Sequence, residues 1–158
     1  MARLNLVAAN KEAKGAPRVR ATARPVPVVI RSNDGPKDHF ITKNGLSYAG
    51  SHLIIDLWEA EGLGDRERIE TALIDAVKQA GATLLHIHLH TFEESGGISG
   101  VAVLAESHIS VHTWPERSYA AFDVFMCGDA EPRKALDVFK RAFNPRRIVI
   151  GEHKRGVL

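Results

Sequence analysis

The segment from Glu106 to Glu116 gathers groups that can do acid, base and nucleophilic chemistry. Its eleven residues include the Ser107 hydroxyl, two imidazoles and two carboxylates. The only cysteine of the chain, Cys127, follows eleven residues after Glu116. An imidazole can move a proton to or from a hydroxyl, and a thiol can give up a proton near neutral pH. The segment therefore predicts a catalytic site with Ser107 as its candidate nucleophile.

Regular periodicities after Leu46 predict the elements that must position these groups. Helical spacing of apolar residues predicts one helix that is opened by Asp65 and ended by Gly81. A second helix starts near Asp129 and Pro132 and ends before Pro145. Alternation of apolar and polar residues predicts strands over residues 52–58, 83–91, 98–105, 108–113, 118–127 and 146–152. No internal repeat or second domain is evident.

Strand alternation assigns the side chains to two faces of the predicted sheet. One face is apolar: Leu53, Ile55, Leu57, Leu85, Ile87, Leu89, Ile109, Val111, Phe122, Val124 and Met126. The other face is rich in ionisable groups: His52, Asp56, His86, His88, His90, His108, Ser110, His112, Trp114, Asp123 and Cys127. We predict an α+β fold, a two-layer α/β sandwich whose antiparallel sheet carries the helices on one face. The polar face is where a cleft or a subunit contact should form.

Ser107 falls out of phase with His112 in a regular strand, so we expect it in a tight turn between residues 98–105 and 108–113. The segment from Ala105 to His108 contains none of the Gly, Pro, Asn or Asp residues that favour such turns. We therefore predict backbone strain at the Glu106-Ser107 bond. A strained bond before a serine suits an N-to-O acyl shift, in which the Ser107 hydroxyl attacks the Glu106 carbonyl. Elimination and hydrolysis would then leave a pyruvoyl group at residue 107.

Composition and charge describe the rest of the chain. With 158 residues, 44% hydrophobic and 25% charged, the chain suits one globular domain with a modest core. Residues 1–40 hold eight Lys/Arg against three Asp/Glu, and we predict a disordered basic tail over residues 1–44 followed by one domain over residues 45–158. No apolar run reaches membrane-spanning length and no secretory signal is evident, so we expect a cytoplasmic protein with no nucleic-acid or membrane partner.

These motifs resemble those of the small bacterial and archaeal S-adenosylmethionine decarboxylases, over about residues 48–155. The resemblance is carried by the segment Glu106–Glu116, by Gly97-Ile98-Ser99-Gly100, and by the strand from Tyr119 that ends in Cys127-Gly128. It implies self-cleavage between Glu106 and Ser107 into a β fragment (1–106) and an α fragment (107–158). It also implies a covalent pyruvoyl cofactor made from Ser107, which forms a Schiff base with the substrate amine and accepts the electrons of decarboxylation.

The resemblance further assigns roles to individual residues. Ser99 and His112 would assist the cleavage, and Cys127 would protonate the decarboxylated intermediate. Glu116 resembles the residue that binds the ribose hydroxyls of S-adenosylmethionine, and Phe92 the one that stacks on adenine. The implied assembly is a homodimer of cleaved protomers that share active sites, and the product would be the aminopropyl donor for spermidine synthesis.

Several alternatives stay open from the residues alone. The same pyruvoyl chemistry could act on arginine or ornithine. A serine hydrolase using Ser107 and His112 would lack a GxSxG turn. The alternating His86, His88 and His90 could bind a metal, although neighbours on one strand face lie about 6 to 7 Å apart and do not readily converge on one ion. An uncleaved regulatory or metal-binding protein is the remaining class.

Overall fold

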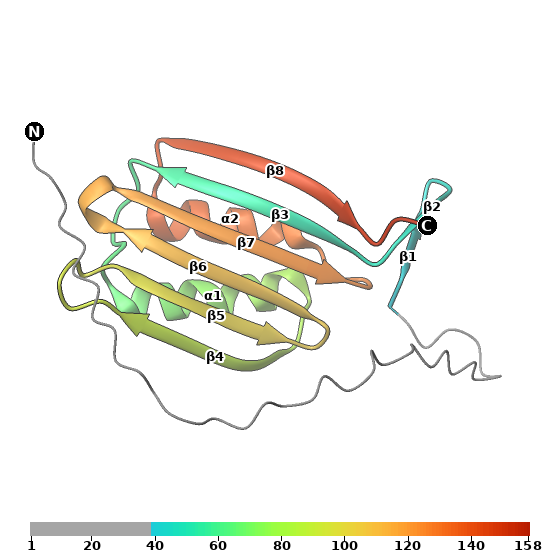
Figure 1. The fold of residues 1–158 in the computed structure, drawn as a ribbon, viewed down its shortest axis with the longest axis horizontal. Coiled ribbons are helices and arrows are strands. Elements are labelled where there is room, and N and C mark those ends of the chain that lie inside the picture. The colour runs from blue at the N-terminus through green and yellow to red at the C-terminus, as the bar shows by residue number, and fades with distance from the viewer. Residues whose placement is uncertain (1–38) are drawn as a thin grey trace, which may run out of the picture. The chain divides into compact units, whose positions relative to one another are not determined.

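A six-stranded antiparallel sheet with two helices on one of its faces dominates residues 39–158, the part that this computed structural model describes (Figure 1). The strand order is β4-β5-β6-β7-β3-β8. The strands are β3 (Gly50–Trp58), β4 (Leu84–Thr91), β5 (Ile98–Leu104), β6 (Ser107–Trp114), β7 (Tyr119–Cys127) and β8 (Arg147–Arg155). The helices are α1 (Arg66–Ala80) and α2 (Pro132–Phe143), and a short 3-10 helix, η1 (Pro115–Arg117), follows β6. The predicted two-layer α+β architecture is confirmed.

The helix ends follow the local signals of the sequence. The Asp65 side chain accepts a hydrogen bond from the Arg68 N–H at 3.0 Å and so caps α1. Gly81 ends this helix in the left-handed conformation, with φ of 75°. In α2 the first position is Pro132, as expected for a residue without an N–H, and Asn144 is the left-handed residue after the last turn. Both predicted helices are confirmed.

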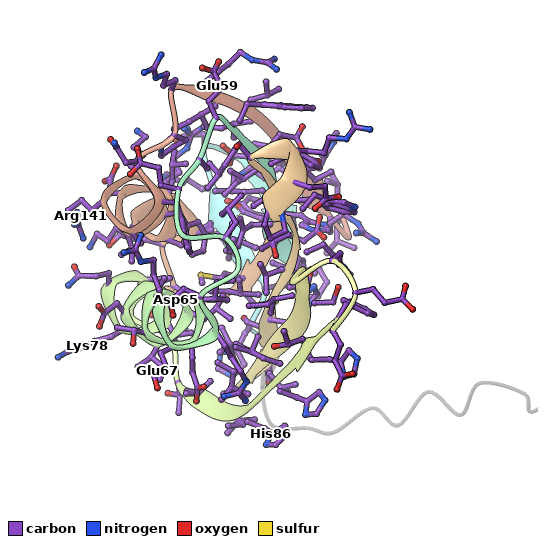
Figure 2. All side chains as sticks on the ribbon, turned by 90° about the vertical axis from the view of Figure 1, so that its left-hand side faces the viewer. Glu59, Asp65, Glu67, Lys78, His86 and Arg141 are labelled. Carbon is purple, nitrogen blue, oxygen red and sulfur yellow. The ribbon has the colours of Figure 1, made fainter. Side chains whose placement is uncertain are left out.

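The core lies between the sheet and the two helices. Figure 2 shows both helices on one side of the sheet, with Lys78 and Arg141 on the side that faces away from it. Phe122 of β7 stacks on Phe139 of α2, with ring centroids 4.2 Å apart. Burial follows the predicted alternation in β3, β6 and β7, where every second residue is buried. The opposite face, which we call the open face, carries no element of the described residues.

Two sequence predictions about strand residues are wrong. Leu85 was expected in the core, but its side chain is 64% exposed because a bulge shifts the β4–β5 register between Leu84 and His86. Leu84 packs against the core in its place. Ser107 was expected within a turn, but it is the first residue of β6 and pairs with Leu104. The turn itself consists of Ala105 and Glu106.

The chain before the main sheet forms a small hairpin of β1 (Ile41–Lys43) and β2 (Leu46–Tyr48). Asn44 and Gly45 both have positive φ, 53° and 78°, as the two central residues of a tight hairpin turn require. The described chain therefore has strand structure in residues 41–43, inside the segment that the sequence predicts as tail. Residues 1–38, the remainder of that predicted tail, lie outside the described residues. Within residues 39–158 no helix is both long enough and apolar enough to cross a membrane.

The bulge in β4 gives a test of the core with two matched leucines. Leu89→Ala removes a side chain that is 6% exposed and should lower the free energy of unfolding by about 2 to 5 kcal/mol. Leu85→Ala removes a side chain that is 64% exposed and should change it by no more than about 0.5 kcal/mol. Urea denaturation of both variants checks this expectation. Equal losses would mean that Leu85 is in the core after all.

Candidate active site

The turn between β5 and β6 holds Glu106 in a conformation that side chains disfavour. Its φ is 58°, in the left-handed region, although it is neither glycine nor asparagine. Such a conformation raises the local free energy by about 1 to 3 kcal/mol. The predicted backbone strain is therefore present, and it lies on the residue whose carbonyl is bonded to the Ser107 nitrogen.

Ser107 is in direct contact with the end of β7. The Cys127 N–H donates a hydrogen bond to the Ser107 Oγ at 3.1 Å, which holds the hydroxyl at the end of β7. The Cys127 thiol is half-buried. Burial raises the pKa of this thiol, the nearby Glu106 carboxylate raises it further, and a hydrogen bond with Ser107 lowers it. We call Glu106, Ser107 and Cys127 the cleavage-turn group.

Ser99 and His112 meet across β5 and β6, on the open face. They are directly paired in the ladder, and the Ser99 Oγ lies 2.8 Å from His112 Nδ1. This end of β6 is anchored by the next residue, Thr113. Its hydroxyl accepts a hydrogen bond from the Ile98 N–H at 2.8 Å and donates one to the Leu63 carbonyl at 2.9 Å. The imidazole is thus held at a fixed position on an otherwise accessible surface.

A row of neighbouring rings runs from His112 across the open face, tilted between His112 and Trp114 and stacked beyond Trp114. The His112 and Trp114 ring centroids are 6.3 Å apart, Trp114 and Tyr119 are 5.2 Å apart, and Tyr119 and Trp58 are 4.3 Å apart. The Arg147 guanidinium covers the far side of Trp58 at 4.7 Å. Tyr119 also donates a hydrogen bond to Asp56 at 2.7 Å, and burial together with this carboxylate raises the pKa of Tyr119 to about 12.

Glu116 and Phe92 lie at the same end of the sheet as His112. Glu116 is exposed in η1, directly after β6, and Phe92 follows the last residue of β4 with its side chain 47% exposed. The loop that Phe92 begins returns to β5, since the Phe92 N–H donates a hydrogen bond to the Gly97 carbonyl at 2.8 Å. We call Ser99, His112, Glu116 and Phe92 the imidazole group.

The cleavage-turn group and the imidazole group lie at opposite ends of the sheet. Ser107 is the first residue of β6, and His112 comes five residues later on the same strand, which corresponds to about 16 Å. The two side chains also have opposite parity, so that His112 shares its face with His108 and Ser110, whereas Ser107 does not. The structure thus unites Ser107 with Cys127 and Ser99 with His112, and it separates these two pairs within one chain.

Comparison with known proteins shows the family of the chain. Residues 51–156 match the family described as S-adenosylmethionine decarboxylase. The chain is 46% identical over 112 residues to an S-adenosylmethionine decarboxylase proenzyme of Methanococcus maripaludis (strain C7), covering 69% of this chain and 91% of that protein. It is 40% identical over 110 residues to the proenzyme of Thermomicrobium roseum, covering 69% and 95%.

A solved structure is similar as well. The crystal structure of the adenosylmethionine decarboxylase from Aquifex aeolicus VF5 superposes with a TM-score of 0.62 at 36% identity, covering 70% of this chain and 93% of that one. The chain belongs to the S-adenosylmethionine decarboxylase family. The resemblance inferred from the sequence motifs is confirmed.

The described residues give no support to a metal site at the histidines of β4. His86, His88 and His90 are all exposed on the open face, and His86 lies at the edge of the sheet in Figure 2. Among residues 39–158 no three His, Cys, Asp or Glu side chains are grouped so that they could hold a metal ion. The serine hydrolase alternative is not supported either, because Ser107 and His112 of one chain do not meet.

Sequence reasoning missed one residue near the cleavage turn. His39 precedes β1, and its Nε2 lies 3.5 Å from the Glu106 carboxylate. It stands before the first residue of the family match, residue 51, so the motifs of the S-adenosylmethionine decarboxylases could not point to it. The available signal was Asn44-Gly45, a strong hairpin signal that indicates ordered chain in this segment.

The environment of Cys127 predicts how a change in local charge alters its reactivity. Removing the Glu106 charge should lower the thiol pKa and increase the thiolate fraction at a fixed pH. The variant with Glu106→Gln and Ser107→Ala should therefore react faster with iodoacetamide at about pH 8 than Ser107→Ala alone. Because Cys127 is the only cysteine, mass spectrometry of the alkylated chain reports on it directly. An equal or slower rate would contradict the electrostatic influence of Glu106.

Proposed function

We propose that this protein decarboxylates S-adenosylmethionine after cleaving itself between Glu106 and Ser107. The observation that carries the proposal is the left-handed Glu106 directly before a serine whose hydroxyl is held by the Cys127 N–H. Membership of the S-adenosylmethionine decarboxylase family, and relatives that are named proenzymes, support the same chemistry. The product would be the aminopropyl donor for spermidine synthesis.

The cleavage uses the side chain of Ser107 and the strained turn before it. The Ser107 Oγ attacks the Glu106 carbonyl carbon, the C–N bond breaks, and the nitrogen takes the hydroxyl proton, which gives an ester. Release of the left-handed conformation at Glu106 favours this step. Loss of the Ser107 α-proton then breaks the bond between Cβ and the ester oxygen, and Glu106 leaves as a carboxylate. Hydrolysis of the dehydroalanine that remains releases ammonia and leaves a pyruvoyl group.

A pyruvoyl group supplies a carbonyl that condenses with the substrate amine and accepts the electron pair released with carbon dioxide. The residues around position 107 fit such a group. Cys127 lies next to it, and the raised pKa keeps the thiol protonated near neutral pH, as a proton donor requires. We assign to Cys127 the return of a proton to the substrate carbon.

The imidazole group completes the proposed site from a second copy of the chain. His112 would remove the Ser107 α-proton, with Ser99 fixing its ring through the contact at 2.8 Å. Glu116 would bind the ribose hydroxyls and Phe92 would stack on the adenine, for which its exposed ring is available. Glu116 and Phe92 lie at the end of the sheet opposite the cleavage turn of their own chain, so in this proposal the partner chain supplies both.

A two-fold dimer through the open faces satisfies this requirement. A two-fold axis that crosses the strands reverses the sheet end to end, so the cleavage-turn group of one protomer meets the imidazole group of the other. The open face also exposes apolar side chains that a partner would cover, including Ile54 at 43%, Val103 at 40% and Trp114 at 41%. We propose this homodimer of cleaved protomers as the active form.

The alternatives are less well supported. Pyruvoyl chemistry on arginine or ornithine is not favoured by the relatives, which are named for S-adenosylmethionine. An uncleaved regulatory or metal-binding protein is not favoured either, because the relatives are named decarboxylase proenzymes. The cytoplasmic location, the absence of nucleic-acid partners and the disordered basic tail stay predictions from the sequence.

Two substitutions separate cleavage from turnover. Ser107→Ala removes the attacking oxygen, so the chain should stay whole at 17.3 kDa and show no decarboxylation. Cys127→Ala keeps that oxygen, so the chain should cleave, while turnover should fall by about 100-fold or more because a positioned proton donor is lost. Intact-mass spectrometry and release of labelled carbon dioxide from S-adenosylmethionine measure the two effects. Normal decarboxylation by the Ser107→Ala protein would disprove the proposed function.

The shared site predicts complementation between two inactive variants. Ser107→Ala and His112→Ala should each be inactive alone. When they are co-expressed, half of the dimers are mixed and each mixed dimer has one intact site, so activity should recover to about a quarter of the wild-type value. Co-expression of Ser107→Ala with Cys127→Ala is the control. Both substitutions lie in the cleavage-turn group, so no dimer of this pair contains an intact site.

A further inference from the structure

His39 contacts the cleavage turn from outside the family match. The His39 Nε2 lies 3.5 Å from the Glu106 Oε2, and both side chains are largely exposed. The family match begins only at residue 51. The contact is therefore made by a part of this chain that the matched region does not include.

A backbone hydrogen bond holds His39 next to the end of β7. The Gly128 N–H, directly after Cys127, donates a hydrogen bond to the His39 carbonyl at 3.1 Å. Gly128 has φ of 59°, and a Cβ at this position would come within 3.4 Å of the His39 ring and 3.6 Å of its Cβ. These are ordinary van der Waals distances, so the left-handed φ and not a lack of space favours glycine here. His39 is thus held by backbone while its ring reaches the carboxylate.

The charge and position of Glu106 indicate the role of its contact with His39. Its carboxylate is the charged group that disfavours the thiolate of Cys127. Cleavage would add a second carboxylate to the same residue, because Glu106 would become the C-terminus of the first fragment. His39 and Glu106 both precede the cleaved bond, so their contact would survive the break.

We propose that His39 is a positioning residue, which contacts the Glu106 carboxylate and, when its imidazole is protonated, offsets the carboxylate charge beside Ser107 and Cys127. The inference rests on the proposed self-cleavage and deepens it. In the uncleaved chain the contact would hold the turn in its left-handed form. In the cleaved chain the contact would hold the new C-terminus at Glu106 in place and stop it from moving into the site.

The test compares cleavage rates of the full-length chain by intact mass. His39→Ala should slow cleavage about two- to five-fold, the range expected for an exposed charged contact. His39→Gln keeps an N–H donor for the carboxylate and should restore most of the rate. In a Glu106→Ala background, His39→Ala should have no further effect. Lys43→Ala, an exposed side chain of the same segment, is the matched control and should leave the rate unchanged.

A second measurement does not depend on cleavage. In the Ser107→Ala background, measured at about pH 6 where an ordinary imidazole is largely protonated, His39→Ala should reduce the rate of Cys127 alkylation about two-fold, because the Glu106 charge is no longer offset. Equal cleavage and alkylation rates with and without His39 would overturn the inference. Slowing that Gln does not restore, or that persists in the Glu106→Ala background, would also overturn it, because the role would then be structural. If the wild-type chain stays whole, the proposed function fails, and the alkylation rates alone decide the role of His39.

Discussion

The register of β6 against its two neighbours is the constraint on which the proposed site depends. It pairs His112 with Ser99 at one end of the β5–β6 hairpin and Ser107 with Leu104 at the other. A slip of one residue would turn His112 towards the helices and bring Ile109 and Val111 out of the core. Both of these side chains are fully buried. The free energy of core packing therefore holds the chemical groups in place, although none of those groups belongs to the core.

One-sided burial is the structural reason for the second copy in our proposal. The helices cover the face that carries Leu53, Ile55 and Leu57, and the open face combines rings, imidazoles and exposed aliphatic side chains. A monomer can stabilise its fold in this way, but it presents the two proposed halves of its site at opposite ends. In our proposal the open face of one chain packs on the open face of another and supplies the half of the active site that the other chain lacks.

Much of this arrangement could be predicted from the sequence because the local signals are strong. Asp65, Gly81 and Pro132 mark the helix ends, and strict alternation in β3, β6 and β7 separates core from open face. Leu85 could not be placed, because the bulge beside it arises from pairing with β5 and leaves no mark in β4 itself. The contact of His39 with Glu106 joins residues far apart in the chain, which no spacing rule reaches.

The strand order has a consequence for a chain broken at residue 106. The first fragment would contain β3, β4, β5 and α1, and the second would contain β6, β7, α2 and β8. Because β3 lies between β7 and β8, the two fragments interleave within one sheet. Their separation would require two complete ladders beside β3 to open, and a third between β5 and β6. The two fragments could therefore separate only if the sheet unfolded. A chain cleaved at residue 106 would stay associated without a covalent link between its fragments.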